Sequence, residues 1–138
     1  SGGTAKNTTI EAGGTLGVLD GGKATGVEQQ EGAILIATTD KDTVVSGENT
    51  LGEFSIENGQ AENVLLENGG QLTVVDGTSA TGTTLRESGY QYVESGGTAT
   101  GTIIENGGIQ AVYFRGTADS TTVNNGGTQN VGGTATGT

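Results

Sequence analysis

One short element, Gly-Thr-Ala or a close variant of it, recurs along the chain at a nearly constant interval. The alanines that define the series, separated by steps of 19, 37, 19, 19, 19 and 17 residues, are Ala5, Ala24, Ala61, Ala80, Ala99, Ala118 and Ala135. The step of 37 residues is close to two repeats, and Val45 is the predicted substitute for the missing alanine. A fixed interval of this length is typical of architectures in which identical units stack on one another.

Glycine pairs occur at two fixed places in the repeat, and together they account for many of the 28 glycines. One pair precedes the repeated alanine, at Gly2-Gly3, Gly21-Gly22, Gly96-Gly97 and Gly132-Gly133. The other pair follows it by eight and nine residues, at Gly13-Gly14, Gly69-Gly70, Gly107-Gly108 and Gly126-Gly127. Asparagine often precedes the second pair, and Asn-Gly favours turns that need a positive φ. Each repeat is therefore predicted to contain two turns that bracket extended segments.

Apolar residues keep the same offset from the repeated alanine in successive repeats. Five residues after it stand Ile10, Leu66, Leu85, Ile104 and Val123, and thirteen after it stand Val18, Val74, Val93, Val112 and Val131. Residues two apart on a strand share a face, so the offsets of three and eleven residues point inward as well. The offset of eleven holds Leu16, Leu35, Leu72, Gln91, Gln110 and Gln129. Buried amides are costly when unpaired, but stacked identical amides can bond to one another along the axis.

A unit of about 19 residues cannot bury its apolar face alone, but it can when each unit stacks on the next at about 4.8 Å. The sequence therefore predicts an all-β fold, a single-stranded parallel β-helix (β-solenoid), over residues 1–138 as one fragment of about eight rungs. The glycine pairs vanish between Asp40 and Asn58, which predicts an irregular rung near 40–58. Phe54 and Ile56 are expected to supply a core strand there, in a rung that either bends the rod or carries a loop facing solvent.

Composition excludes several classes of function. A net charge of −11 with no basic stripe repels phosphate backbones, so no nucleic-acid partner is expected. The chain has no cysteine and no histidine, so thiolate metal sites, disulfides and the commonest general base are absent. No apolar run approaches the roughly 20 residues that span a bilayer. The regular periodicity argues against disorder, despite the high glycine content.

The frame Gly-Gly-Thr-Ala-x-x-Thr-x-Ile/Val-x-x-Gly-Gly-x-Gln-x-Val occurs clearly in residues 96–112 and approximately in 115–131. It resembles the passenger repeats of self-associating autotransporter adhesins, the antigen 43-like group that also contains the adhesin involved in diffuse adherence and TibA. Residues 51–56, followed by 59–70, are similar to a non-repeat stretch of these proteins. The resemblance implies a right-handed β-helix displayed on the bacterial cell surface and tethered to the outer membrane by a C-terminal barrel. The signal, autochaperone and translocator segments are expected to lie outside this sequence.

The resemblance also implies a function, which is autoaggregation and biofilm formation through polar side chains on one face of the helix. The matching outward positions, two and four residues after the repeated alanine, give the self-association candidates Asn7, Thr9, Asn63, Thr84, Ser120 and Thr122. A secondary surface ladder flanks the alanines themselves, at Ser79, Thr81, Thr98, Thr100, Thr134 and Thr136. The expected partner is a second copy on another cell, with a host glycan or host protein as the alternative. No membrane insertion by this segment is expected.

Three alternatives remain open at this stage. The Thr-x-Thr arrays resemble those of ice-binding β-helices. The resemblance to the autotransporter adhesins implies that the exposed Ser and Thr residues are candidates for heptosylation, as in some relatives. Polysaccharide lyases share the β-helix fold, but only Arg86 and Arg115 could serve as catalytic arginines, so no enzyme, catalytic residue or cofactor is predicted. Glu11, Glu67 and Glu105 share one offset, where stacked carboxylates repel unless a cation or water intervenes. Weak surface cation binding follows from that column, but no dedicated metal site is predicted.

Overall fold

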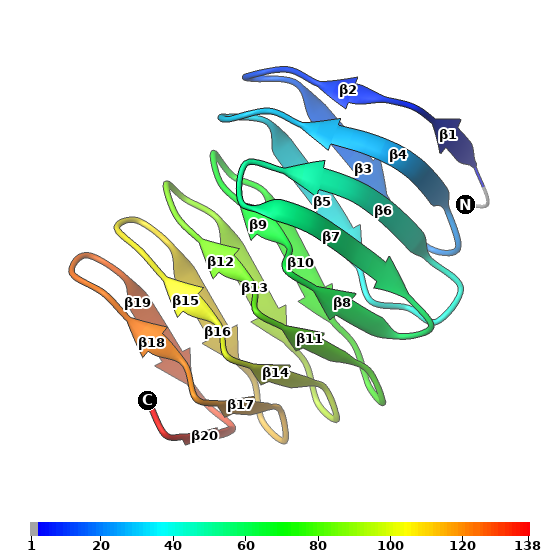
Figure 1. Ribbon diagram of the computed structural model, residues 1–138. Helices are drawn as coiled ribbons and strands as arrows, with labels where there is room; N and C mark the ends of the chain where they lie inside the picture. Colours follow the sequence, from blue (N-terminus) through cyan, green and yellow to red (C-terminus); the bar gives the residue numbers. More distant parts are fainter. Residues whose placement is uncertain (1–2) are drawn as a thin grey trace.

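The structure, a computed structural model, describes residues 3–138, and all regular elements in that range are strands (Figure 1). The first sheet contains β1 (Thr4–Lys6), β4 (Lys23–Gln29), β6 (Val44–Asn49), β7 (Gly52–Glu57), β8 (Gln60–Glu62), β11 (Ser79–Thr81), β14 (Thr98–Thr100), β17 (Thr117–Asp119) and β20 (Thr134–Thr136), with β2 (Thr9–Ile10) paired to β4. The second contains β3 (Thr15–Val18), β5 (Ile34–Thr38), β10 (Gln71–Val74), β13 (Tyr90–Val93), β16 (Ile109–Val112) and β19 (Thr128–Val131). The third contains β9 (Leu65–Leu66), β12 (Thr84–Leu85), β15 (Ile103–Ile104) and β18 (Thr122–Val123). Gly2, in the first predicted glycine pair, lies outside the described residues.

Equivalent residues of successive repeats lie directly beside one another in parallel strands. Ala80 pairs with Ala99, which pairs with Ala118. The valine column, thirteen residues after the alanine, is paired in the same register through β10, β13, β16 and β19. Val45 pairs with Ala24, as predicted for the substituted alanine. The predicted solenoid of stacked parallel coils is therefore confirmed.

The two glycines of a pair have different physical roles. In Gly107-Gly108, the first glycine has a φ of +83°, a backbone conformation that residues with side chains rarely adopt. The second lies so close to the coil before it that a Cβ atom there would overlap the carbonyl oxygen of Leu85. One glycine thus turns the chain, while the other lets consecutive coils approach at the corner.

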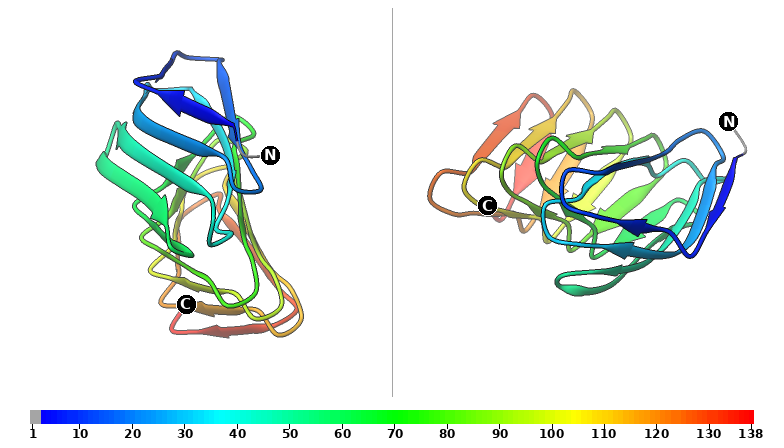
Figure 2. Two further views of the ribbon diagram at one scale, coloured as in Figure 1. Left: turned by 90° about the vertical axis from the view of Figure 1, so that its right-hand side faces the viewer. Right: turned by 90° about the horizontal axis from the view of Figure 1, so that it is seen from above.

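Residues 40–58 form a hairpin on one side of the solenoid. Strand β6 pairs in parallel with β4, then β7 runs back antiparallel to β6, and β8 reverses again. The hairpin adds no strand to the second sheet, where β5 pairs directly with β10. Because β6 and β7 stand between β4 and β8 on the first sheet only, the coils before and after them lean apart on that side (Figure 2). The axis of the rod therefore bends at the hairpin.

The interior changes character along the rod. Coils near the hairpin bury apolar side chains at the offsets of three and eleven residues, such as Val64, Leu35 and Leu72. The C-terminal coils bury Gln91 and Gln110 at the same place. There Val93, Val112, Ala99 and Ala118 form a separate small apolar cluster with Ala135 packed against it, while Leu85 and Ile104 remain part of the main core.

The buried glutamines form the predicted ladder. Gln110 donates from Nε2 to Oε1 of Gln91 at 2.7 Å, and Gln129 donates in the same way to Gln110 at 2.7 Å. Gln91 also donates to the hydroxyl of Thr83 at 3.1 Å and accepts from that of Thr102 at 3.1 Å. Since a hydrogen bond contributes about 1 kcal/mol net and a buried orphan costs more, this polar core depends on the pairing between coils. The amide ladder is therefore confirmed.

Candidate binding surfaces

The residues two places after the repeated alanine have a left-handed backbone conformation, and from β8 onward they lie in a tight bend between the first and third sheets. Asn7, Asn63 and Ser120 have φ values of 53°, 59° and 57°, in the left-handed region. Glycines occupy the same offset in other coils, with φ values of 65° at Gly26 and 70° at Gly82. This offset is thus a turn position, and the glycines in its column were the sequence signal for it.

The residues four places after the alanine do not form one continuous surface. Thr9 and Thr122 are exposed, but Thr84 is only 6% exposed, so its assignment to an open self-association face is corrected. The tip of the hairpin, residues 48–53, lies beside Thr84 and shields it from solvent. Thr84 lines a groove with Leu51 and Glu53 of that tip.

Side chains hold this tip against the coils beside it. Asn49 donates from Nδ2 to the carbonyl oxygen of Asn63 at 3.0 Å. Arg86 donates to the hydroxyl of Thr50 at 3.5 Å. Leu65, which pairs with Thr84 in the third sheet, is fully buried in the same region. The tertiary position of the hairpin therefore divides the predicted face into two parts.

The secondary ladder forms a regular array on the outer side of the first sheet. In one row, Ser79 pairs with Thr98, Thr98 with Thr117, and Thr117 with Thr134. In the next row the paired residues are Thr81, Thr100, Asp119 and Thr136. The alanines between the two rows point inward and are fully buried from Ala80 to Ala118, so the flanking side chains point outward. The array spans four consecutive coils with one charged side chain.

The predicted carboxylate column contains a cation from the chain itself. Arg86 stands between Glu67 and Glu105, with Nε 2.9 Å from Oε2 of Glu67 and an Nη atom 3.6 Å from Oε1 of Glu105. Burial alone would lower the pKa of Arg86, but the hydrogen bond and charge of Glu67 raise it. The carboxylates of this column were expected to repel one another unless a cation or water intervened, and in these coils Arg86, which occupies the same offset, is that cation. Within residues 3–138, no group of three or more His, Cys, Asp or Glu side chains is placed to hold a metal ion.

A row of tyrosines, which the sequence patterns did not single out, begins on β13 of the second sheet and ends just after β16. The rings of Tyr90 and Tyr92 are nearly parallel, with centroids 5.5 Å apart and an interplanar angle of 11°. Tyr92 and Tyr113 are 6.2 Å apart at 5°. The spacing of Tyr90 and Tyr92, two residues apart on one predicted strand, was the available signal.

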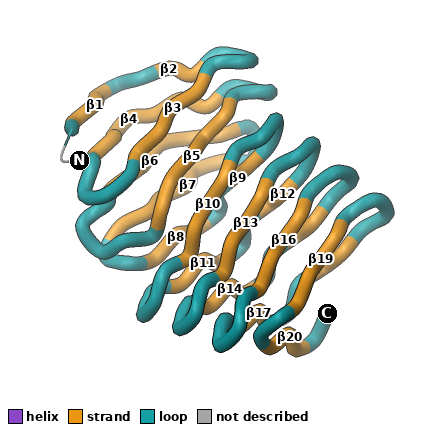
Figure 3. Tube along the Cα trace, turned by 180° about the vertical axis from the view of Figure 1, so that it is seen from behind, coloured by secondary structure: helices purple, strands orange, loops and turns teal. Residues whose placement is uncertain are grey.

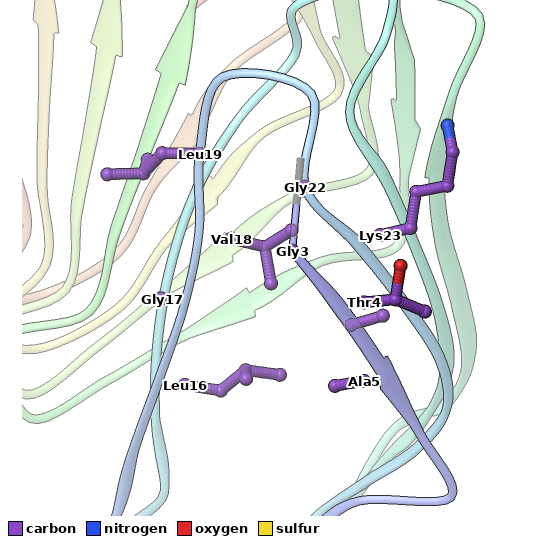
Figure 4. A pocket seen from close by; sticks show the side chains of 10 residues that line it. Gly3, Thr4, Ala5, Leu16, Gly17, Val18, Leu19, Gly22 and Lys23 are labelled. Carbon is purple, nitrogen blue, oxygen red and sulfur yellow. The ribbon is translucent and has the colours of Figure 1, made fainter. Parts of the chain in front are cut away.

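A hollow beside the first coil is an extension of the core (Figure 4). Ala5, Leu16 and Val18 line it, and these are inward positions of the repeat. Lys23 is the one lining residue with a titratable side chain. The hollow thus has the chemistry of the interior and not of a binding site. Residues 3–138 form no helix that is long and apolar enough to cross a membrane.

Comparison with known proteins shows that this chain is similar to bacterial autotransporters. The family described as "Adhesin of bacterial autotransporter system, probable stalk" matches residues 46–108. The probable autotransporter YpjA of Escherichia coli K12 is 46% identical over 59% of this chain and 7% of its own length. The autotransporter adhesin/invasin TibA of Escherichia coli O78:H11 is 56% identical over 33% of this chain and 5% of its own. The autotransporter CRAC of Citrobacter rodentium is 56% identical over 30% of this chain and 3% of its own length.

A crystal structure of a TibC-catalysed, hyper-glycosylated TibA fragment is 31% identical, with a TM-score of 0.46, over all of this chain and 62% of that one. The chain spans only a few per cent of the length of its curated relatives. Over the matched residues it is homologous to the autotransporters YpjA, TibA and CRAC. These homologues are passengers exposed at the bacterial surface and tethered to the outer membrane.

Proposed function

We propose that this segment mediates self-association between cells, and thereby autoaggregation and biofilm formation, as a non-catalytic part of an adhesin passenger. The array of hydroxyls on β11, β14, β17 and β20 is the observation that best supports this function. It repeats one surface pattern over four coils in strict register. A second rod of the same repeat can therefore meet it with many equivalent contacts.

Avidity supplies the strength in this proposal. A single hydroxyl contact contributes only about 1 kcal/mol, so one coil would bind weakly. Contacts repeated along a rod become intramolecular after the first, and their effects combine. The bend and short strand near Ser120 and Thr122 border the array and extend its polar surface, whereas Thr84 is covered.

The charge of the chain sets a condition on this association. Each copy has a net charge of −11, so two copies repel each other at long range. Salt screens that repulsion, with a Debye length of about 10 Å at 0.1 M. The array contains only Asp119 as a charged group, so its own contacts do not add much repulsion. Self-association is therefore expected to strengthen as salt increases from very low ionic strength.

Sedimentation velocity at several protein and salt concentrations tests the proposal. The chain should form dimers whose fraction rises with concentration and with salt. Replacing Thr98 and Thr117 by Asp adds like charges to both copies, and should weaken dimerisation at least tenfold. The matched variant with Ser at both positions keeps the hydroxyls and should dimerise normally.

Cells that display the full passenger provide the second readout. Settling of the culture should slow for the Asp variant and remain unchanged for the Ser variant. A chain that stays monomeric at all concentrations, together with unchanged settling of the Asp variant, would refute self-association through this face.

A further inference from the structure

The outer face of the second sheet differs from the rest of this acidic molecule. Figure 3 shows its six strands, β3, β5, β10, β13, β16 and β19, side by side. Among the described residues, none of those in these six strands carries a charge. The first sheet, by contrast, includes charged residues in β1, β4, β6, β7, β8 and β17. In a chain with a net charge of −11, an uncharged sheet of this extent is a distinct surface.

The centre of this face is aromatic. Tyr90, Tyr92 and Tyr113 are the only tyrosines of the chain, and all three stand in one row of nearly parallel rings. Tyr113 is 48% exposed, and Phe114 next to it is 71% exposed, with the guanidinium of Arg115 5.3 Å from its ring centre. Exposed aromatic groups gathered at one place are typical of binding surfaces.

Small polar groups flank the row on both sides. Gln71 and Thr73 of β10 are paired with Tyr90 and Tyr92. On the other side β16 intervenes with Ile109 and Ala111, and its neighbour β19 places Thr128 and Asn130 in the same register. Amides and hydroxyls of this kind both donate and accept hydrogen bonds.

The tyrosine hydroxyls add neutral groups to this surface. Burial and the neighbouring tyrosines raise the pKa of Tyr92, so its hydroxyl stays protonated well above neutral pH. A protonated phenol donates and accepts hydrogen bonds without bringing a charge to the face.

We propose that the tyrosine row and its polar flanks bind a neutral glycan. A sugar ring has an apolar face of C–H groups, which suits aromatic rings, and hydroxyls at its edge, which suit amides and hydroxyls. Charge supports the same occupant, because the strands of this face carry no cation, the neighbouring Arg115 is engaged by the ring of Phe114, and the molecule as a whole repels anions. A neutral glycan also loses no ionic hydration when it binds to an uncharged surface.

This inference concerns a different sheet from the one assigned to self-association, so the two can fail independently. The glycan face lies on β10, β13, β16 and β19 (Figure 3), whereas the hydroxyl array lies on β11, β14, β17 and β20. Substitutions on one sheet leave the outward side chains of the other unchanged. Each surface therefore serves as the control for the other.

The test begins with a printed array of neutral and acidic oligosaccharides, probed with the intact chain. Neutral oligosaccharides should be retained, and sialylated or sulfated ones should not. A retained oligosaccharide is then titrated in solution while tyrosine fluorescence is followed. The chain contains no tryptophan, so this emission comes from the three rings of the row alone.

Two variants separate ring contact from general damage. Tyr113→Ala should weaken binding at least tenfold, and since Tyr113 is half exposed the fold should persist, as circular dichroism can verify. Tyr113→Phe keeps the ring and should stay within about threefold of the parent chain. The Thr98 and Thr117 variant on the hydroxyl array should bind the oligosaccharide normally.

Several results would overturn the proposal. Retention of acidic glycans alone would reject the charge argument. Equal binding by the Tyr113→Ala variant would exclude the row from the contact. If the parent chain binds no glycan and the Tyr113→Ala variant no longer dimerises, this face is a protein interface instead.

Discussion

The coils near the hairpin and the C-terminal coils use one scaffold with two different interiors. At matching inward offsets, Leu72 is fully buried in an apolar core, while Gln91 is equally buried in the next coil along the chain. The apolar side chain contributes through packing and removal from water. The amide avoids a penalty only because Thr83, Thr102 and Gln110 complete its hydrogen bonds. A stacked coil thus accepts either chemistry, provided that the neighbouring coils supply the matching partner.

The largest effect is expected in the apolar region. Leu72→Ala should lower the free energy of unfolding by about 2–5 kcal/mol, because it removes buried methyl groups and leaves a cavity. Chemical denaturation followed by circular dichroism measures the change. A loss below about 1 kcal/mol would show that this interior is loosely packed, and would contradict the contrast drawn between the two regions. Gln71→Ala, on the outward side of the same strand, is the matched control.

An intermediate effect is expected in the ladder. Gln91→Leu preserves the volume but leaves the hydroxyl of Thr102 and the amide of Gln110 without their acceptor. Each buried orphan costs about 1–3 kcal/mol, offset partly by the added apolar area, so a net loss of about 1–3 kcal/mol is expected. Unfolding by denaturant gives the value. An unchanged or increased stability would mean that the ladder contributes nothing in these coils.

The smallest net effect is expected when the whole ladder is exchanged. The combined variant changes each ladder glutamine to Leu and each partner threonine to Val, at Gln91, Gln110, Gln129, Thr83, Thr102 and Thr121. Replacing both partners of a buried hydrogen bond by apolar groups of similar shape is nearly neutral. Its stability should therefore stay within about 1 kcal/mol of the parent chain, above that of Gln91→Leu alone. A loss larger than that of the single variant would show that the polar interior is specifically required.

Much of this architecture was predictable because stacking copies one local pattern into space. The 19-residue interval predicted which residues would be neighbours, and the pairings of the alanine and valine columns confirm it. The recurrence of glutamine at one inward offset predicted the amide ladder for the same reason. Local sequence carries this information since each coil contacts mainly the coil before and after it.

The candidate surface was less predictable. Thr84 has the offset of an exposed residue, but a hairpin from another part of the chain covers it. Arg86 has an acidic residue at its offset in the coils on both sides, and only their actual distances show it joined to Glu67 and Glu105. The cover over Thr84 does not follow from the repeat, because the hairpin departs from it. The 19-residue interval does place Arg86 beside Glu67 and Glu105, but the ion pairs themselves come from the distances.

The sequence alone therefore determined the solenoid, its corners and its inward columns, because these follow from a periodic pattern of glycine, apolar and amide residues. Only the tertiary structure decided that residues 40–58 reverse into β7 and β8, bend the rod and cover part of one face. The physical reason is that a strand can pair in parallel with a new coil or antiparallel with its own return. Backbone hydrogen bonds are satisfied in both arrangements, so packing against the rest of the molecule decides between them.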